Sequence, residues 1–203
     1  MKSLSEIDIV SKRASRAAGF PWGIAEEVGK NIRILESFGL LGIKSLNYYY
    51  KKRQTEKFEN LSLITENNKL ISSSYCPIVC GTSFLDQIKS LENLNEISFE
   101  KIAYPILFLA FVSRASEIIG KRIFIEVDEY KFLLNLNNSI YASIINNEVI
   151  KLASNIKIKF IENSDSFLES EWQELYKLSE NIFVDETDDL KSKAAGAGLT
   201  DND

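Results

Sequence analysis

The sequence predicts an α+β fold in which helices come first, a sheet comes late, and a last helix covers the sheet. In the first 60 residues, apolar residues recur every three or four positions, as on the buried face of a helix. After residue 122 the spacing changes to two, as in a strand with one buried face. Between these regions, residues 107–119 form a largely apolar run that suits a central buried helix.

The first two predicted helices form a hairpin. Ser3 and Glu6 have the spacing of a capping box, and the apolar stripe that follows them ends at Gly19. A second helix begins after Pro21 and ends before Gly39, with its own apolar stripe. Together with a third helix, these elements make a helical lobe at the N-terminus.

The third helix is predicted over residues 43–57, with Leu46, Tyr49 and Tyr50 on one side and a basic KKR run on the other. This helix completes a helical lobe over about residues 1–60. In residues 61–94 the apolar positions are interrupted by polar ones, and the only sharp stops are Pro77 and Gly81. We therefore expect short strands or loops there.

The second half predicts an antiparallel meander of four to five strands. Residues 123–127 and 156–160 alternate apolar with polar or charged side chains, and pairs of asparagines mark two turns between them. Ser166 and Glu169 then open a final helix, in which Leu168, Trp172, Leu175 and Ile182 share a face. We expect this helix to cover the sheet.

These elements predict one globular domain over residues 1–184, in which residues 61–184 form a mixed lobe. The remaining residues, 185–203, are an acidic and then glycine-rich tail.

The composition excludes several classes of function. The chain contains no histidine, which rules out Ser-His-Asp and Cys-His catalysis within it and every imidazole metal site. The 29 acidic and 24 basic residues give a net charge of -5, which disfavours nucleic acid as a partner. Cys76 and Cys80 are too few for a disulfide framework or a structural zinc, and we expect two buried thiols.

Targeting signals are also missing from the pattern. The first ten residues carry acidic groups where a signal peptide needs an apolar run. The apolar stretch at residues 102–112 is about half the ~20 residues that a bilayer span requires. We therefore expect a soluble cytoplasmic protein that does not bind a membrane.

The turn between the first two helices, RASRAAGFPWGIAEE, concentrates residues that suit an anionic ligand. Arg13 and Arg16 offer forked donors, and Trp22 offers a flat surface near the start of the second helix. Glu26 and Glu27 stand in the first turn of that helix and are the candidate acid-base residues. The alternative is that the arginines only neutralise these glutamates while Trp22 fills the core.

The tail offers a second set of candidate ligand-binding residues. Gly196, Gly198 and Thr200 could present backbone amides to an anion, while Asp201 and Asp203 carry carboxylates at the end. The peptide lacks the lysine and spacing of a P-loop and the third glycine of a dinucleotide fingerprint. We predict no metal site here, and no pattern identifies a cofactor.

The segments RASRAAGFPWGIAEEVGK and AGAGLTDND together resemble a bacterial family catalogued only as a domain of unknown function. The resemblance implies a bacterial cytoplasmic protein and no particular reaction. Members of that family more often have an additional glycine and an arginine near the start of the closing peptide, where this chain has Ala194, Lys191 and Lys193.

Three hypotheses for function follow. In the first, the tail folds back on the helical hairpin and forms a site for a small anionic molecule or a protein partner. Without a ligand, the same contact would be a structural latch, either within one chain or exchanged between the subunits of a homodimer. In the second, the chain is a lyase, isomerase or hydrolase that uses Glu26 or Glu27 as its base. In the third, it is an accessory subunit whose tyrosines at positions 48–50 contribute to an exposed patch, or else mostly pack in the core.

Overall fold

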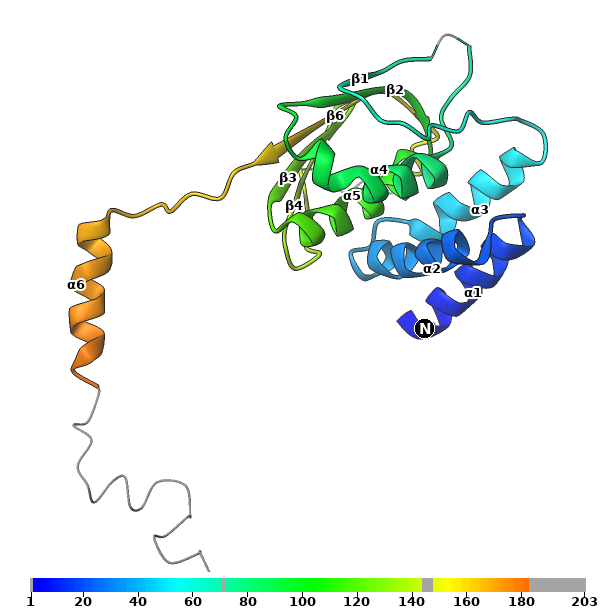
Figure 1. Ribbon diagram of the computed structural model, residues 1–203. Coiled ribbons are helices and arrows are strands. Elements are labelled where there is room, and N and C mark those ends of the chain that lie inside the picture. The colour runs from blue at the N-terminus through cyan, green and yellow to red at the C-terminus, as the bar shows by residue number, and fades with distance from the viewer. Residues whose placement is uncertain (1, 71, 144–147, 183–203) are drawn as a thin grey trace, which may run out of the picture. The chain divides into compact units, whose positions relative to one another are not determined.

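The computed structural model describes residues 2–70, 72–143 and 148–182 and confirms the α+β class. The chain forms two compact units, Met1–Asn163 and Ser164–Asp203. The first contains five helices and a six-stranded sheet in its described residues, and the second is described through a single helix, α6 (Glu169–Glu180) (Figure 1).

The N-terminal helices are α1 (Leu4–Ala17), α2 (Trp22–Ser37) and α3 (Gly42–Arg53). They follow the predicted pattern, except that α3 ends at Arg53 and not at residue 57. The Ser3 hydroxyl accepts a hydrogen bond from the Glu6 amide at 3.1 Å, as the capping-box spacing predicts. Gly19, with φ of 95°, ends the first helix in the backbone region that favours glycine. Helix α2 packs on α1, α3 and α5 and so joins this lobe to the rest of the unit.

The region expected to hold only short strands or loops contains a helix, α4 (Pro77–Leu91), so that prediction was wrong. Pro77 is the first residue of the helix, where its missing N–H costs nothing, and Cys76 caps the end. Gly81 does not stop the helix either, because it lies in the interface with α5, where a Cβ would overlap the ring of Phe111. Both predicted stops therefore have positions that a helix tolerates.

The sheet has six strands in the described residues, in the order β1-β2-β6-β3-β4-β5. They are β1 (Asn67–Asn68), β2 (Ile97–Ala103), β3 (Arg122–Val127), β4 (Tyr130–Leu134), β5 (Ile140–Ala142) and β6 (Leu152–Ile161). The predicted meander holds for β3, β4 and β5, but β6 inserts between β2 and β3, and β1 pairs in parallel with β2. The sheet is therefore mixed. Residues 144–147, which include the second predicted asparagine turn, lie outside the described residues.

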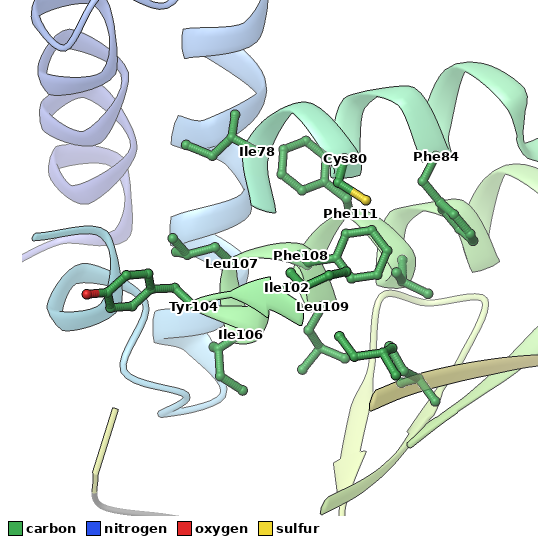
Figure 2. Packing of buried hydrophobic residues seen from close by; sticks show 14 of the residues in the cluster. Ile78, Cys80, Phe84, Ile102, Tyr104, Ile106, Leu107, Phe108, Leu109 and Phe111 are labelled. Atoms are coloured by element: carbon green, nitrogen blue, oxygen red, sulfur yellow. The ribbon is translucent and has the colours of Figure 1, made fainter. Parts of the chain in front are cut away.

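Helix α5 (Pro105–Ile119) is the buried centre that the apolar run predicts. It contacts α2, α3 and α4 on one side and β3 and β4 on the other. The ring of Phe108 meets Phe84 and Phe99 edge to face, with ring centroids 5.8 and 5.3 Å apart. Figure 2 shows side chains of α4, β2 and α5 gathered in this single cluster.

The last helix belongs to the second unit, and none of its residues is buried. Within the first unit, α5 packs against β3 and β4 of the sheet. The predicted covering of the sheet by the last helix stays a prediction. Helix α6 also begins later than the spacing of Ser166 and Glu169 predicts, because Leu168 is its cap residue.

Candidate functional site

The turn between α1 and α2 brings together two of the predicted ligand-binding residues. Arg16 donates a hydrogen bond to the Phe20 carbonyl at 3.2 Å, and its guanidinium lies 5.6 Å from the centre of the Trp22 ring. Arg13 is exposed and has no hydrogen bond or ion pair with any residue in the described part of the chain. Trp22 is 58% exposed, so it does not fill the core.

Glu26 and Glu27 are neutralised, but not by Arg13 or Arg16. Lys12 pairs with Glu26 at 3.1 Å, while Lys30 pairs with Glu27 at 3.0 Å. Arg114 of α5 pairs with the other oxygen of Glu27. Arg114 lies 87 positions from Glu27 along the chain, so no local sequence pattern predicts this pair.

The environment of Glu27 argues against its predicted role as a base. Burial alone would raise the pKa of Glu27, but hydrogen bonds from Arg114 and Lys30 outweigh it and hold the pKa below its usual value. A carboxylate held ionised in this way is a weak proton acceptor near neutral pH. The Glu27 cluster is therefore structural in character and ties α2 to α5.

The remaining predicted site residues are Gly196, Gly198, Thr200, Asp201 and Asp203. All five lie outside the described residues. The predicted contact between the tail and the helical hairpin therefore stays a prediction.

A cavity of about 560 Å³ lies where the end of α1, the last turns of α3 and the start of α4 meet. We call it the Arg53 cavity. Its lining residues are Ala17, Ala18, Tyr49, Tyr50, Arg53, Gln54, Glu56, Lys57, Phe58, Asn60 and Cys76. The volume falls within the range of about 300–1,000 Å³ that is typical of small-molecule sites.

Arg53 is held in place by two contacts with the turn after α1. It donates a hydrogen bond to the Ala18 carbonyl at 2.6 Å, and its guanidinium lies 4.2 Å from the centre of the Phe20 ring. A guanidinium has five N–H donors, so most of them remain for a ligand. The side chain is thus positioned before any ligand binds.

The charge of the cavity wall is positive. Neither Arg53 nor Lys57 pairs with a carboxylate among the described residues. The one acidic lining residue, Glu56, is engaged by Lys52 at 2.5 Å. A negative group entering the cavity would therefore meet two cations whose charge is not already balanced locally.

The inner wall carries a phenol and a thiol in contact. The Tyr49 hydroxyl and the Cys76 sulfur lie 2.9 Å apart, and the Val79 amide donates to the same sulfur at 3.4 Å. Burial raises the pKa of the Tyr49 phenol well above its usual range, so the phenol is neutral. Cys80, one turn further along α4, is fully buried, and burial raises its pKa as well. The prediction of two buried thiols is confirmed.

Aromatic rings make up much of the rest of the wall. The ring of Tyr49 packs against Phe58 at 5.2 Å and Tyr104 at 5.8 Å between centroids. Tyr50 donates to the Ser15 hydroxyl at 2.6 Å, which ties α3 to α1, and burial raises its pKa to about 12. The cavity therefore combines cations with a flat, largely neutral aromatic surface, a combination suited to binding.

A second hollow of about 260 Å³ lies between α1 and α3 and is mainly apolar. Its charged lining residues, Lys2 and Glu6, pair with each other at 2.8 Å. It has no unbalanced charge to select a ligand, so the Arg53 cavity is the stronger candidate.

Sequence reasoning did not single out Arg53 or Cys76 as site residues. The signal for Arg53 was its place in the KKR run after three tyrosines, which was interpreted as one side of a helix. Cys76 was predicted only as a buried thiol, and the structure shows that it also caps the start of α4. Because α4 was not predicted, the sequence did not indicate that Cys76 and Arg53 line one cavity.

The described residues contain neither a metal-binding cluster nor a membrane-spanning helix. Among them, no group of three or more His, Cys, Asp or Glu side chains is placed to hold a metal ion. No described helix combines the length and the apolar character needed to cross a membrane.

Comparison with known proteins adds one finding. No curated protein and no solved structure matches the chain. A family match over residues 2–72 covers α1, α2 and α3 and the first motif of the predicted resemblance, but not the closing AGAGLTDND. Residues 2–72 match a family described as a protein of unknown function (DUF3726), which confirms the resemblance to a domain of unknown function over that part of the chain.

Proposed function

We propose that the protein binds a small anionic molecule in the Arg53 cavity. The observation that carries the proposal is a pair of cations, Arg53 and Lys57, that have no carboxylate partner among the described residues and line a cavity of about 560 Å³. The anionic group of the ligand would meet the guanidinium, for which a carboxylate or a phosphate is the matching shape.

The body of the ligand is expected to be flat or apolar. It would lie against the rings of Tyr49, Tyr50 and Phe58, which line the same cavity. Gln54 and Asn60 add amide groups that can hydrogen-bond to polar edges. The proposal keeps the anionic ligand predicted from sequence and moves its main contact from Arg13, Arg16 and Trp22 to Arg53.

The proposal is for binding, because the predicted base Glu27 is held ionised by its partners. Contributions from Gly196, Gly198, Thr200, Asp201 and Asp203 form a separate proposal. A chain ended at Lys193 tests them, since a ligand effect that requires the tail would disappear in it. The protein partner, the homodimer and the cytoplasmic location likewise stay predictions.

The test measures thermal stability of the full chain with a panel of aromatic and aliphatic carboxylates and phosphates. A ligand at a concentration of 100 times its Kd adds about 2.7 kcal/mol to the free energy of unfolding. For a chain of this size, that gain raises Tm by roughly 5–11 °C. Arg53→Gln should abolish the shift. Lys57→Gln, which removes no contact described above, should reduce it without changing the Tm of the free protein.

Arg33→Gln is the matched control. Arg33 is also an exposed helical arginine, but it pairs with Asp8 at 3.7 Å and does not line the cavity. The control should keep the full ligand shift. A panel with no stabilising member, or a shift that survives in both Arg53→Gln and Lys57→Gln, contradicts the proposal.

A further inference from the structure

A different face of α3 carries a groove that shares no lining residue with the Arg53 cavity. Two hollows of about 230 and 280 Å³ have Tyr48 and Lys51 in common, and together we call them the Tyr48 groove. The groove is lined by Lys44, Asn47, Tyr48, Lys51, Lys52, Thr55, Tyr104 and Lys151.

Four of these residues are lysines, and none of the lining residues is acidic. Lys52 is engaged by Glu56, but Lys44, Lys51 and Lys151 have no ion pair or side-chain hydrogen bond among the described residues. In a chain whose net charge is -5, acidic residues outnumber basic ones, so unpaired lysines gathered at one groove are unexpected.

Helix stability explains only part of this cluster. Lys51 and Lys52 lie in the last turn of α3, where a cation interacts favourably with the helix dipole. Lys44 lies in the first turn, where the dipole disfavours a cation. Lys151 comes from another segment, whose carbonyl accepts a hydrogen bond from the Tyr104 amide at 2.9 Å.

Tyr48 supplies an aromatic surface in the middle of these charges. It lies between Lys44 and Lys51 on one face of α3 and is 43% exposed, whereas Tyr49 is fully buried. The tyrosine triplet therefore divides between core and surface, as one of the predicted alternatives held. An exposed tyrosine flanked by lysines can pack on an apolar side chain whose neighbours are acidic.

We propose that the Tyr48 groove binds an acidic peptide segment of a partner protein. The Cα atoms of Lys44 and Lys51 are about 10 Å apart along the helix, and an extended segment of five residues spans about 13 Å. Its carboxylates meet Lys44, Lys51 and Lys151, and an apolar side chain between them packs on Tyr48. Charge complementarity identifies this occupant.

Two other polyanions fit the groove less well. Nucleic acid and anionic membranes present broad negative surfaces, and both would be repelled by the net charge of -5 on the chain. A short acidic segment needs only the groove itself.

The test uses the full chain and a fluorescent nine-residue peptide of glutamate and aspartate with phenylalanine at its centre. Fluorescence anisotropy should show binding that weakens as salt is raised. A peptide with glutamine and asparagine in place of the acids should not bind. The double variant Lys44→Gln/Lys51→Gln should weaken binding about tenfold, and Tyr48→Ala should weaken it at unchanged salt dependence.

The matched control is Lys89→Gln/Lys157→Gln, which removes the same charge from lysines outside the groove. It should bind the acidic peptide like the natural chain. Absence of binding, equal binding of the neutral peptide, or an equal loss in the control overturns the proposal. Tighter binding of a single-stranded oligonucleotide or of phosphatidylserine vesicles, lost in the groove variant, also overturns it.

Discussion

Helices α5 and α6 were both predicted from their apolar residues, which form a nearly continuous run in α5 and a stripe on one face in α6, and their surroundings are opposite. Eleven of the 15 residues of α5 are buried, while none of the 12 residues of α6 is. Helix α6 is supported by local contacts: Glu171 accepts from the Leu168 amide at 2.7 Å, and Phe167 stacks on Trp172 at 5.6 Å. An apolar stripe therefore predicts a helix without predicting what covers it.

The largest expected effect tests the buried member of this comparison. Phe108→Ala in α5 removes a fully buried ring that contacts Phe84 and Phe99. Loss of buried area together with the remaining cavity should lower the free energy of unfolding by about 3–5 kcal/mol. Urea unfolding followed by circular dichroism measures it. A loss below about 1 kcal/mol would mean that the α5 core is loosely packed.

The second prediction sharpens the comparison by testing how closely α5 meets its neighbour. Gly81→Ala would place a methyl group on the ring of Phe111 in the α4–α5 interface. Alanine favours a helix over glycine by about 1 kcal/mol, but overpacking should outweigh this gain and give a net loss of about 1–3 kcal/mol. Thermal unfolding measures the change. A more stable variant would show that the two helices can move apart at little cost.

The third prediction concerns the charged contact that α5 makes with α2. Arg114→Met should lower the free energy of unfolding at pH 7 by about 2 kcal/mol, because Glu27 loses a charge-assisted hydrogen bond. Folding lowers the pKa of Glu27. The pair therefore stabilises the fold fully at pH values above 4.5, the ordinary pKa of a glutamate, and its stabilisation is lost as pH falls through the lowered pKa of the folded state. Urea unfolding from pH 7 to pH 3 measures both effects.

The control for this pair is Arg33→Met, whose partner Asp8 lies at 3.7 Å near the surface. Arg33→Met should lower the free energy of unfolding by less than about 1 kcal/mol at pH 7. If the difference between the natural chain and Arg114→Met stayed constant down to pH 3, a group other than Glu27 would be responsible.

Local patterns predicted much of the fold. Periodicity identified α1, α2 and the strands β3 and β4, and a nearly continuous apolar run identified α5. Strand β2 was not predicted, because its alternation of apolar and polar residues breaks at Lys101, a residue with φ of 56°. Helix α4 was not predicted, because the proline at its first position and the glycine at its close contact with α5 are residues that usually end a helix.

Long-range contacts explain what sequence could not show. Strand β6 lies between β2 and β3, a placement that no local pattern records. The same is true of the candidate site, where Tyr49 and Cys76 meet across 27 positions, and of the structural pair Glu27 and Arg114, which meet across 87. Residue types led to the hypothesis of an anionic ligand, which stays a prediction. The residues that share a cavity could not be predicted, because Cys76 is brought there by α4, a helix that the sequence pattern did not reveal.

The smallest expected effect tests the exposed member of the comparison. Leu175→Ala in α6 removes a side chain that is 65% exposed, so it leaves no cavity and should change the unfolding free energy by less than about 0.5 kcal/mol. Leu109→Ala in α5 makes the same substitution where the side chain is fully buried, and should cost about 2–5 kcal/mol. Urea unfolding of both variants at one protein concentration measures the contrast. If Leu175→Ala lowered the free energy of unfolding by 2 kcal/mol or more, the apolar stripe on α6 would be buried in solution. Both helices would then have a buried face, and they would differ only in what packs against it.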